Sequence, residues 1–252
     1  MFLLRMFQRK WLFATLLVFA GTALCIRLGI WQLDRLQQRR AFNAEYESAR
    51  AAPALDLNRE QLNNLTSIEW RAVKVMGKYD FANQVALKNQ YHDNQYGFHL
   101  LTPLRFDASS GAGQAVLVDR GWIPAEDNAN PSDWRKYDQP GTVTVSGQLR
   151  LGQTKPAFGG IADTLPKNGE KLELWYNADL AHIANQMPYP ILPVYIQPPT
   201  DLSDTNPPIP FQPEVEITEG PHMGYALQWF TFATILFVGY PFFLRKQGKG
   251  SK

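Results

Sequence analysis

EGPHMGYALQWFTFATILFVGYPFFL, residues Glu219 to Leu244, is the stretch that decides the fold of this chain. The 21 residues from Gly224 to Leu244 carry no charge. At about 1.5 Å of rise per residue, a helix of that length matches the hydrocarbon core of a bilayer. Pro221 suits the first turn because it has no N–H to leave unpaired. The sequence therefore predicts a transmembrane helix over residues 221–244.

His222 is the only ionisable group bordering this span. In steps of three and four residues, His222 shares a helix face with Tyr225 or Ala226 and with Trp229. Two interpretations stay open for this polar-aromatic face. It is a docking face for a flat, amphipathic ligand or a partner helix, or its rings are ordinary anchors in the headgroup region.

A second apolar run lies near the start of the chain, WLFATLLVFAGTALCI from Trp11 to Ile26. Arg27 ends this run but can snorkel, and Leu28 to Leu33 continue the apolar stretch. A cleaved signal peptide is the competing interpretation. It needs small residues at a cleavage site, which the passage into Arg27 lacks, so the sequence favours an uncleaved helix over residues 11–33.

Small residues recur every four positions along this first span, at Gly21, Cys25 and Gly29. Such a stripe lets two helices approach closely in lipid. We expect the stripe to pack against the second span.

Charge predicts the topology of the hairpin. Residues 1–10 and 245–252 together carry seven cations and no acids, whereas the rest of the chain has 18 basic and 23 acidic residues. Basic flanks favour the cytoplasmic side, so we expect both termini in the cytoplasm and residues 34–220 outside. The outer side of the first span opposes this assignment, because it carries Arg27, Arg35, Arg39 and Arg40. The excess of acidic over basic residues between the two termini also argues against a nucleic-acid partner.

The region between the spans predicts one α+β domain of mainly antiparallel strands. Residues 34–50 continue the first helix to a break at Ala51-Ala52-Pro53, and alternation of period two begins at Trp70 and stops at Gly77. The single cysteine lies in a span, so the domain has no disulfide framework. The remaining predicted elements are a helix at 58–64, strands at 84–88, 98–106, 115–123, 142–151, 172–176 and 194–197, a hairpin loop at 109–113, a helix at 178–187 capped by Asn177, and a stiff proline-rich segment at 188–211.

Catalytic signatures are weak. His92, His99 and His182 stand in no metal-ligand spacing, and the chain shows neither a phosphate loop nor a G-x-S-x-G elbow. Asp119-Arg120-Gly121-Trp122 follows an apolar strand and is interpreted as a structural turn, with a buried ion pair or a binding edge as the alternatives.

Three motifs resemble the surfeit locus protein 1 family. They are Leu28-Gly29-Ile30-Trp31-Gln32-Leu33-Asp34-Arg35, the run Val116 to Pro124 with Asp119-Arg120-Gly121-Trp122, and Pro221 to Phe230, which includes Gln228. Their order and the two flanking spans extend the resemblance over nearly the whole chain. The family's turn often has asparagine where Asp119 stands, which leaves the Arg-Gly-Trp part unchanged.

The resemblance implies a membrane-anchored assembly factor, not an enzyme, for haem-copper cytochrome c oxidase. It implies haem a as a transient cofactor, subunit I of the oxidase as a partner, and haem a synthase as a further candidate partner. In bacterial members it implies haem a binding through the histidine that opens the second span, here His222. Because no targeting extension precedes the first span, a bacterial inner membrane is expected.

Chemistry adds three hypotheses to this resemblance. A neutral imidazole is a good axial ligand for haem iron, which suits His222. From spacing, we expect Tyr225 and Trp229 to pack against the porphyrin and Arg35 to pair with a propionate. Gly29, Trp31, Gln32, Arg120, Gly121, Trp122 and Gln228 are expected to serve structure or partner binding.

Two other classes remain. A pure scaffold would grip the oxidase without handling haem. An enzyme or sensor would need a cluster of perturbed acids and bases that the sequence does not display.

Overall fold

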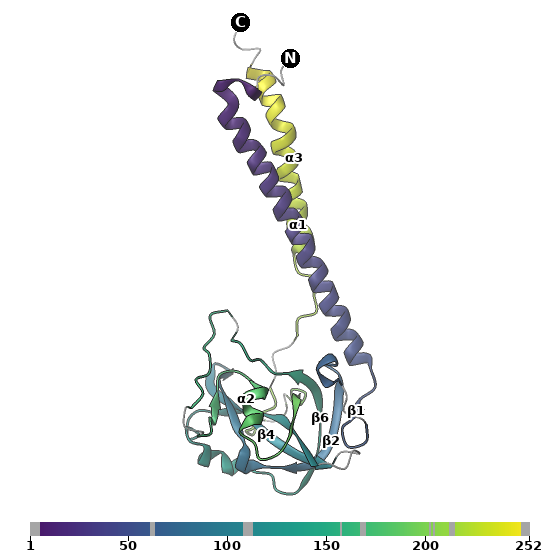
Figure 1. The fold of residues 1–252 in the computed structure, drawn as a ribbon, viewed down its shortest axis with the longest axis vertical. Helices are drawn as coiled ribbons and strands as arrows, with labels where there is room; N and C mark the ends of the chain where they lie inside the picture. Colours follow the sequence, from purple (N-terminus) through teal and green to yellow (C-terminus); the bar gives the residue numbers. More distant parts are fainter. Residues whose placement is uncertain are drawn as a thin grey trace. The chain divides into compact units, whose positions relative to one another are not determined.

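A computed structural model gives the fold of residues 6–60, 64–107, 113–156, 158–166, 170–201, 203, 205–211 and 215–247. The chain divides into two compact units. One contains Met1–Glu45 with Val215–Lys252, and the other contains Tyr46–Glu214. Figure 1 shows a helical pair for the first unit and a β-rich domain for the second.

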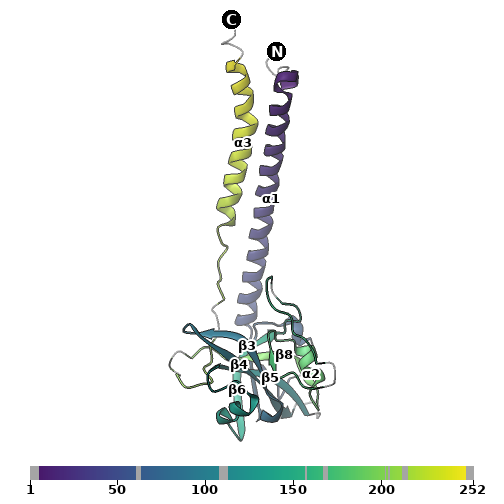
Figure 2. The ribbon, with the colours of Figure 1, turned by 90° about the vertical axis from the view of Figure 1, so that its left-hand side faces the viewer.

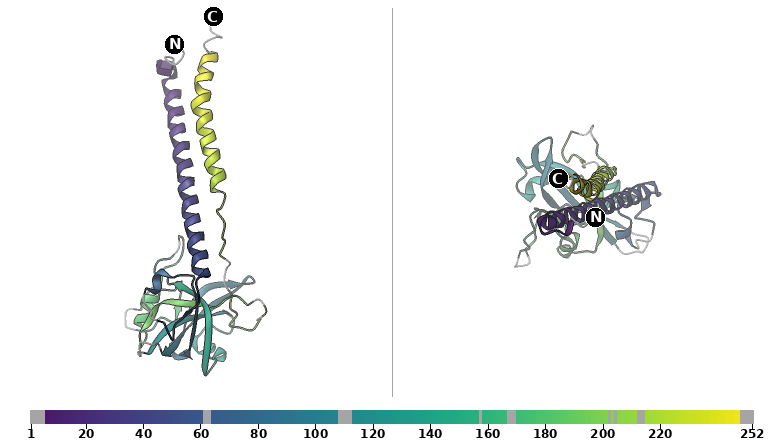
Figure 3. Two further views of the ribbon diagram at one scale, coloured as in Figure 1. Left: turned by 90° about the vertical axis from the view of Figure 1, so that its right-hand side faces the viewer. Right: turned by 90° about the horizontal axis from the view of Figure 1, so that it is seen from above.

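The helical unit contains α3, His222–Gln247, and all but the last residues of α1, Arg9–Ala51, which from Tyr46 on belongs to the other unit. Both are long and apolar enough to cross a bilayer. The predicted spans are thus confirmed as helices, and α1 runs without a break from its apolar half into its polar half, ending near residue 51 as expected. Figures 2 and 3 show the two helices side by side and antiparallel, so that the start of α1 and the end of α3 lie at the same end of the pair.

The domain is built on one eight-stranded sheet in the order β1-β2-β6-β8-β5-β4-β3-β7, and a pairing of β2 with β4 closes part of it into a barrel. The prediction of a mainly antiparallel α+β domain is confirmed by the pairs β2–β4, β2–β6, β3–β4, β4–β5 and β6–β8. Parallel pairing of β1–β2, β3–β7 and β5–β8 was not predicted. The strands are β1 Leu55–Asp56, β2 Ala72–Tyr79, β3 Val85–His92, β4 Gln95–Asp107, β5 Gly113–Pro124, β6 Thr142–Leu151, β7 Leu174–Trp175 and β8 Ile191–Gln197.

The predicted end of β2 at Gly77 is wrong, because the strand continues to Tyr79. At Gly77 the backbone of β4 passes so closely that a β-carbon would clash with the carbonyl oxygen of Arg105. Glycine therefore serves the closure of the barrel here, where β2 leaves β6 and pairs with β4.

Apolar side chains from the inner faces of the strands fill the barrel. Leu104, Val118, Leu149 and Ile196 are fully buried in one cluster. A second cluster, which includes Leu101, Trp175 and Ile183, packs α2 against the sheet. The domain thus has its own hydrophobic core, as a cysteine-poor domain requires.

Several local predictions need correction. The late helix α2 spans Leu180–Asn185, and its N-cap is Asp179, whose carboxylate accepts the N–H of His182. Residues 58–60 form a turn and not a helix, and the neighbouring 3-10 helix is Leu65–Ser67; residues 61–63 lie outside the described ranges. The predicted hairpin loop also lies outside them, except for Gly113. The proline-rich segment is attached to the barrel, where Ile209 pairs with Trp122.

Candidate functional site

Small residues on α1 face α3, as the glycine stripe predicted. A β-carbon on Gly29 would lie 2.7 Å from the Phe230 ring, and one on Gly21 would lie 3.4 Å from Leu236. Ala226 of α3 is 1% exposed at the same interface. The helices are therefore closely packed, and a macrocycle has no room directly between them at this level.

His222 begins α3 at the mouth of this pair, and its ring contacts α1. The Nδ1 atom lies 2.8 Å from Oε1 of Gln32, which is 9% exposed. Because an amide oxygen only accepts hydrogen bonds, Nδ1 carries the proton, and Nε2 of a neutral ring keeps its lone pair. Nε2 makes no hydrogen bond with the residues that the structure describes.

Gly220 lies beside the free edge of this imidazole. Its φ of 66° is left-handed, and a β-carbon there would stand 3.5 Å from Nε2 of His222. Glycine suits this conformation and leaves that side of Nε2 clear. The arrangement presents one oriented nitrogen lone pair at the end of the helix pair.

The other residues of the predicted haem site occupy a different flank of the helices. Tyr225 is 46% exposed, Trp229 is partly buried with its ring 6.0 Å from Phe232, and Arg35 is exposed and donates to Gln38 at 2.8 Å. Gln32 and Ala226 lie in the interface between the two helices. At 3.6 residues per turn, the three side chains project away from this interface, and all three project to the same side of it. They share a flank with each other, but within the described part of the chain none of them forms a hydrogen bond or a ring contact with His222.

Two arginines of α1 bind the segment that leads into α3. These contacts were not predicted from the sequence. Arg39 donates to the carbonyl oxygens of Glu216 and Thr218, the latter at 2.8 Å. Arg40 makes a two-pronged contact with the carboxylate of Glu219, at 2.7 and 2.9 Å. The hydrogen bond and charge of Arg40 lower the pKa of Glu219, and Glu219 in turn raises the pKa of Arg40. The four-residue helix spacing from Arg35 to Arg39 was visible in the sequence, but the distant acceptors were not.

Arg120, Gly121 and Trp122 do not form the predicted turn, because they lie within β5. Gly121 has a φ of 117°, and a β-carbon there would clash with the carbonyl of Ile209, the residue that pairs with Trp122. The motif therefore fastens the proline-rich segment to the barrel.

Arg120 is 7% exposed, and its guanidinium donates to Gln84 at 3.3 Å and to the carbonyl oxygen of Tyr137. It lies over the rings of Tyr79 and Phe81, at 5.3 and 5.1 Å. Burial lowers the pKa of Arg120. These contacts give Arg120 a structural role in the domain.

A buried ion pair does exist beside this motif, between Asp119 and His99. Nδ1 of His99 lies 3.0 Å from both carboxylate oxygens, and Oδ1 of Asp119 also accepts the N–H of Gly121. Burial by itself lowers the pKa of His99, but the charge and hydrogen bond of Asp119 outweigh it, so the pKa is raised. His92 and His182 lie elsewhere, His92 against Trp122 and Phe211, and His182 on Asp179.

The remaining motif residues are separated. Gly29 and Gln32 lie in the helix interface, whereas Trp31 is 45% exposed and Gln228 is exposed. Within the described ranges, no three His, Cys, Asp or Glu side chains gather around a common point as metal ligands. The single oriented imidazole is accordingly the best-defined candidate site in the helical unit.

The chain is similar to known proteins over most of its length. The sequence model described as the SURF1 family matches residues 19–234. A SURF1-like protein of Rickettsia bellii is 26% identical over 224 residues, covering 87% of this chain and 86% of the relative. A SURF1-like protein of Rickettsia felis is 24% identical over 237 residues, with 91% and 96% covered. Surfeit locus protein 1 of Arabidopsis thaliana is 22% identical over 281 residues, with 92% and 77% covered.

Proposed function

This chain belongs to the SURF1 family, which is linked to cytochrome c oxidase assembly, and we propose that it is a membrane-anchored assembly factor for such an oxidase. We propose further that it binds haem a through His222 and assists insertion of this haem into subunit I. Subunit I is then its principal partner, and haem a synthase is a candidate donor.

One observation carries the haem proposal, the hydrogen bond of 2.8 Å from Nδ1 of His222 to Gln32. Histidines that bind metals commonly donate their second ring nitrogen in this way, which fixes the tautomer and the ring orientation. Gln32 thereby leaves Nε2 as the atom that would bind iron, and Gly220 keeps its side clear. The residues present fit the group.

A single axial ligand suits a carrier better than a permanent holder. Met223 follows His222 directly, but neighbouring helix residues point about 100° apart and cannot both bind one iron. Haem a, when bound, brings the iron porphyrin that the oxidase requires. His222 would hold it by one bond, and Gln32 would orient that bond, which is compatible with release to another protein.

The sequence-based roles of Tyr225, Trp229 and Arg35 require the macrocycle to lie on their flank of the helix pair. Arg35 is exposed, and among the residues that the structure describes its guanidinium donates to Gln38, so it is available for a propionate. These three roles remain predictions.

We propose that α1 and α3 span a bacterial inner membrane, with both termini cytoplasmic and the barrel domain in the periplasm. The two candidate spans and their basic, acid-free ends support this topology. Arg39 and Arg40 weaken the opposing signal, because their charges are engaged by the segment 216–219.

Haem a copurification tests the function. The variant His222→Ala should lose haem a, measured by absorption spectroscopy of protein purified from cells that make haem a. The same change at the exposed His182 should retain it. Membrane fractionation checks that both variants are inserted. If His222→Ala keeps full haem occupancy, the ligand assignment is wrong, and if it supports full oxidase assembly without haem, the protein is a scaffold that stabilises oxidase subunits.

A further inference from the structure

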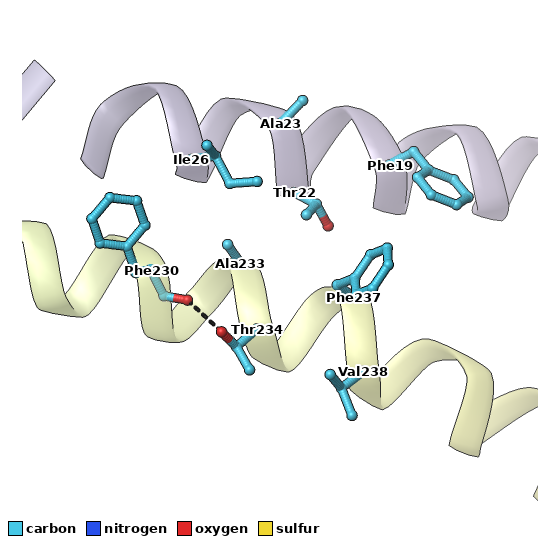
Figure 4. Close-up of a pocket in the computed structure, with 9 residues that line it drawn as sticks. All are labelled: Phe19, Thr22, Ala23, Ile26, Phe230, Ala233, Thr234, Phe237 and Val238. Atoms are coloured by element: carbon cyan, nitrogen blue, oxygen red, sulfur yellow. Dashed lines mark hydrogen bonds between the residues drawn. The ribbon is translucent and has the colours of Figure 1, made fainter. Parts of the chain in front are cut away.

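Each unit of the chain contains a hollow that is large enough for a ligand. The one in the helical unit has a volume of about 490 Å³, and Figure 4 shows Ile26 and Thr22 of α1 and Phe230 and Phe237 of α3 projecting into the space between the two ribbons. No charged residue lines this groove. Because the acyl chains of a bilayer match an uncharged wall as well as other apolar molecules do, the groove selects no particular ligand.

The pocket of the barrel domain differs from this groove because charged residues line it. Its volume is about 950 Å³, near the upper end of the range for ligand sites. It lies beside Gly77, where β2 leaves β6 and pairs with β4. Four cations and two acids belong to its wall, namely Arg59, Lys78, Arg105, Arg135, Asp80 and Asp107. The wall therefore carries an excess of positive charge.

Two of these cations lie directly opposite each other. Lys78 of β2 is the register partner of Arg105 of β4, and both residues are exposed. Opposed residues of an antiparallel pair project to the same face with their β-carbons about 5 Å apart, and like charges in these positions repel each other. Gly77 permits this arrangement, because its lack of a β-carbon lets the two backbones approach closely. The closure of the barrel thus brings two positive charges together despite their repulsion.

The described part of the chain does not neutralise this pair, because neither Lys78 nor Arg105 forms an ion pair with its residues. The other two cations of the wall differ in this respect. Each of them forms an ion pair with an acid three positions away, at 3.7 Å in one case and 3.1 Å in the other. Lys78 and Arg105 are therefore the cations that an anion from outside would bind.

Asp80 interacts with the charge of Arg105, but its oxygens already accept other hydrogen bonds. They come from the hydroxyl of Tyr189 at 2.7 Å, from Asn83 at 2.9 Å and from the N–H of Ala82 at 3.1 Å. Burial by itself raises the pKa of Asp80, but these bonds and the charge of Arg105 outweigh it, so the pKa is lowered. The guanidinium of Arg105 lies 5.1 Å from the Tyr189 ring, which helps to orient it.

We propose that this pocket binds an acidic, extended segment of a partner protein, with one carboxylate of the segment between Lys78 and Arg105. A carboxylate suits this pair because a guanidinium offers two parallel N–H donors to its two oxygens. Its negative charge also removes the repulsion between the two cations. The site lies in the barrel domain and does not depend on haem binding at His222.

Apolar side chains in the same wall favour a peptide over a small anion. Met76 is 55% exposed, and Phe81 of the neighbouring 3-10 helix Phe81–Asn83 is half-buried. Met76 and Lys78 project from the same face of β2, about 7 Å apart along the strand. Successive side chains on one face of an extended peptide have the same spacing. A segment that contains both acidic and apolar residues therefore matches the wall, whereas phosphate or citrate would use only its charges.

Calorimetric titration of the full chain in phosphatidylcholine nanodiscs tests the proposal. The probe is an acetylated hexapeptide that alternates glutamate with leucine, and the matched peptide has glutamine in place of each glutamate. The glutamate peptide should bind at least about tenfold more tightly. Its affinity should fall as the salt concentration rises, because salt screens exposed charges. Equal affinity of the two peptides would refute recognition by charge.

Variants of two lysines on one face of β2 locate the site. Lys78→Gln should weaken binding of the glutamate peptide at least about tenfold. Lys74→Gln is the matched control, because Lys74 lies outside the pocket and already pairs with Asp56, and it should change the affinity by less than about twofold. Equal losses in both variants would place the peptide elsewhere. His222→Ala should bind the peptide like the wild type, so failure of the haem proposal leaves this test intact.

Stability distinguishes a binding pair from a structural one. In the absence of peptide, Lys78→Gln should raise the urea midpoint for unfolding of the barrel domain, because it removes the repulsion from Arg105. Saturating glutamate peptide should raise the midpoint of the wild type and have little effect on the variant. A lower midpoint for the peptide-free variant would mean that Lys78 supports the fold, and would refute the proposal.

Other occupants would give different results. If citrate or inorganic phosphate displaces the glutamate peptide at concentrations as low as unlabelled peptide does, the pocket is a site for small anions. If phosphatidylglycerol vesicles bind the wild type but not Lys78→Gln, and the peptide binds neither, the pocket faces a lipid surface. Each of these results overturns the assignment to a protein segment.

Discussion

Gln32 offers the most direct test of how the helix pair prepares its histidine. Gln32→Leu removes the acceptor of the 2.8 Å hydrogen bond and leaves the N–H of His222 facing an apolar side chain. Loss of such a supporting contact typically costs 10- to 100-fold in metal affinity, which corresponds to about 1.4 to 2.8 kcal/mol. Hydrogen bonds between membrane helices average only about 0.6 kcal/mol. We therefore expect haem affinity to fall while the helix pair persists.

The assay is haem a titration of the inserted protein, with interhelical disulfide cross-linking as the check on packing. Gln38→Leu is the matched control, because Gln38 lies on the same helix but is exposed and bonds to Arg35. Gln32→Glu should retain haem binding, since a carboxylate accepts the same N–H and makes the imidazole a stronger base. Haem affinity of Gln32→Leu within twofold of the wild type would refute the reasoning that this contact orients the ligand.

Three further perturbations test other contacts. Gly29→Leu should weaken interhelical cross-linking more than Gly21→Leu, because the added carbon meets the facing ring at 2.7 Å in one case and a methyl group at 3.4 Å in the other; equal effects would contradict this. Gly77→Ala should cost about 3 kcal/mol of domain stability in denaturant unfolding, since it strikes backbone; a change below 1 kcal/mol would contradict barrel closure at this residue. His99, whose pKa is raised by Asp119, stabilises the fold fully below its unfolded pKa of about 6.5 and progressively less as pH rises through its folded pKa. His99→Gln should flatten that decline in hydrogen-exchange protection, and an unchanged pH profile would reject it.

Local sequence patterns predicted the helices and strands of this fold well, but they did not predict how the strands close into a barrel. An uncharged run of bilayer length and strands of period two are set by neighbouring residues, so α3 and β6 were found with nearly their true bounds. Gly77 was misinterpreted as the end of a strand. A glycine is needed there because the backbone passes close to Arg105 of β4, almost thirty residues later in the sequence. The N-cap of α2 was placed at Asn177 instead of Asp179, a difference that only the cap geometry resolves.

The candidate site shows the same division. His222 stood out from the sequence, because an ionisable group at the mouth of an apolar span is rare. Its partner Gln32 lies 190 positions earlier and was noticed only as part of a motif of the resembling family, where it was expected to serve structure or partner binding and not to contact His222. The contact between His222 and Gln32 could not be foreseen, because it exists only where two helices from opposite ends of the chain run together.

The charges in the polar half of α1 show the same difference between the sequence and the fold. Counted along the sequence, Arg39 and Arg40 contradict a topology with the termini in the cytoplasm. In the folded chain these cations bind the carbonyl groups and the carboxylate of residues 216–219, which lead directly into His222. They therefore hold the entry to α3 against α1, and their interaction requires that both segments lie on the same side of the bilayer. We infer that cations bound by their own chain say little about the orientation of the helices in a bilayer. The basic residues before Trp11 and beyond Leu244 have no acidic residues beside them in the sequence, so they remain the stronger indication that both termini are cytoplasmic.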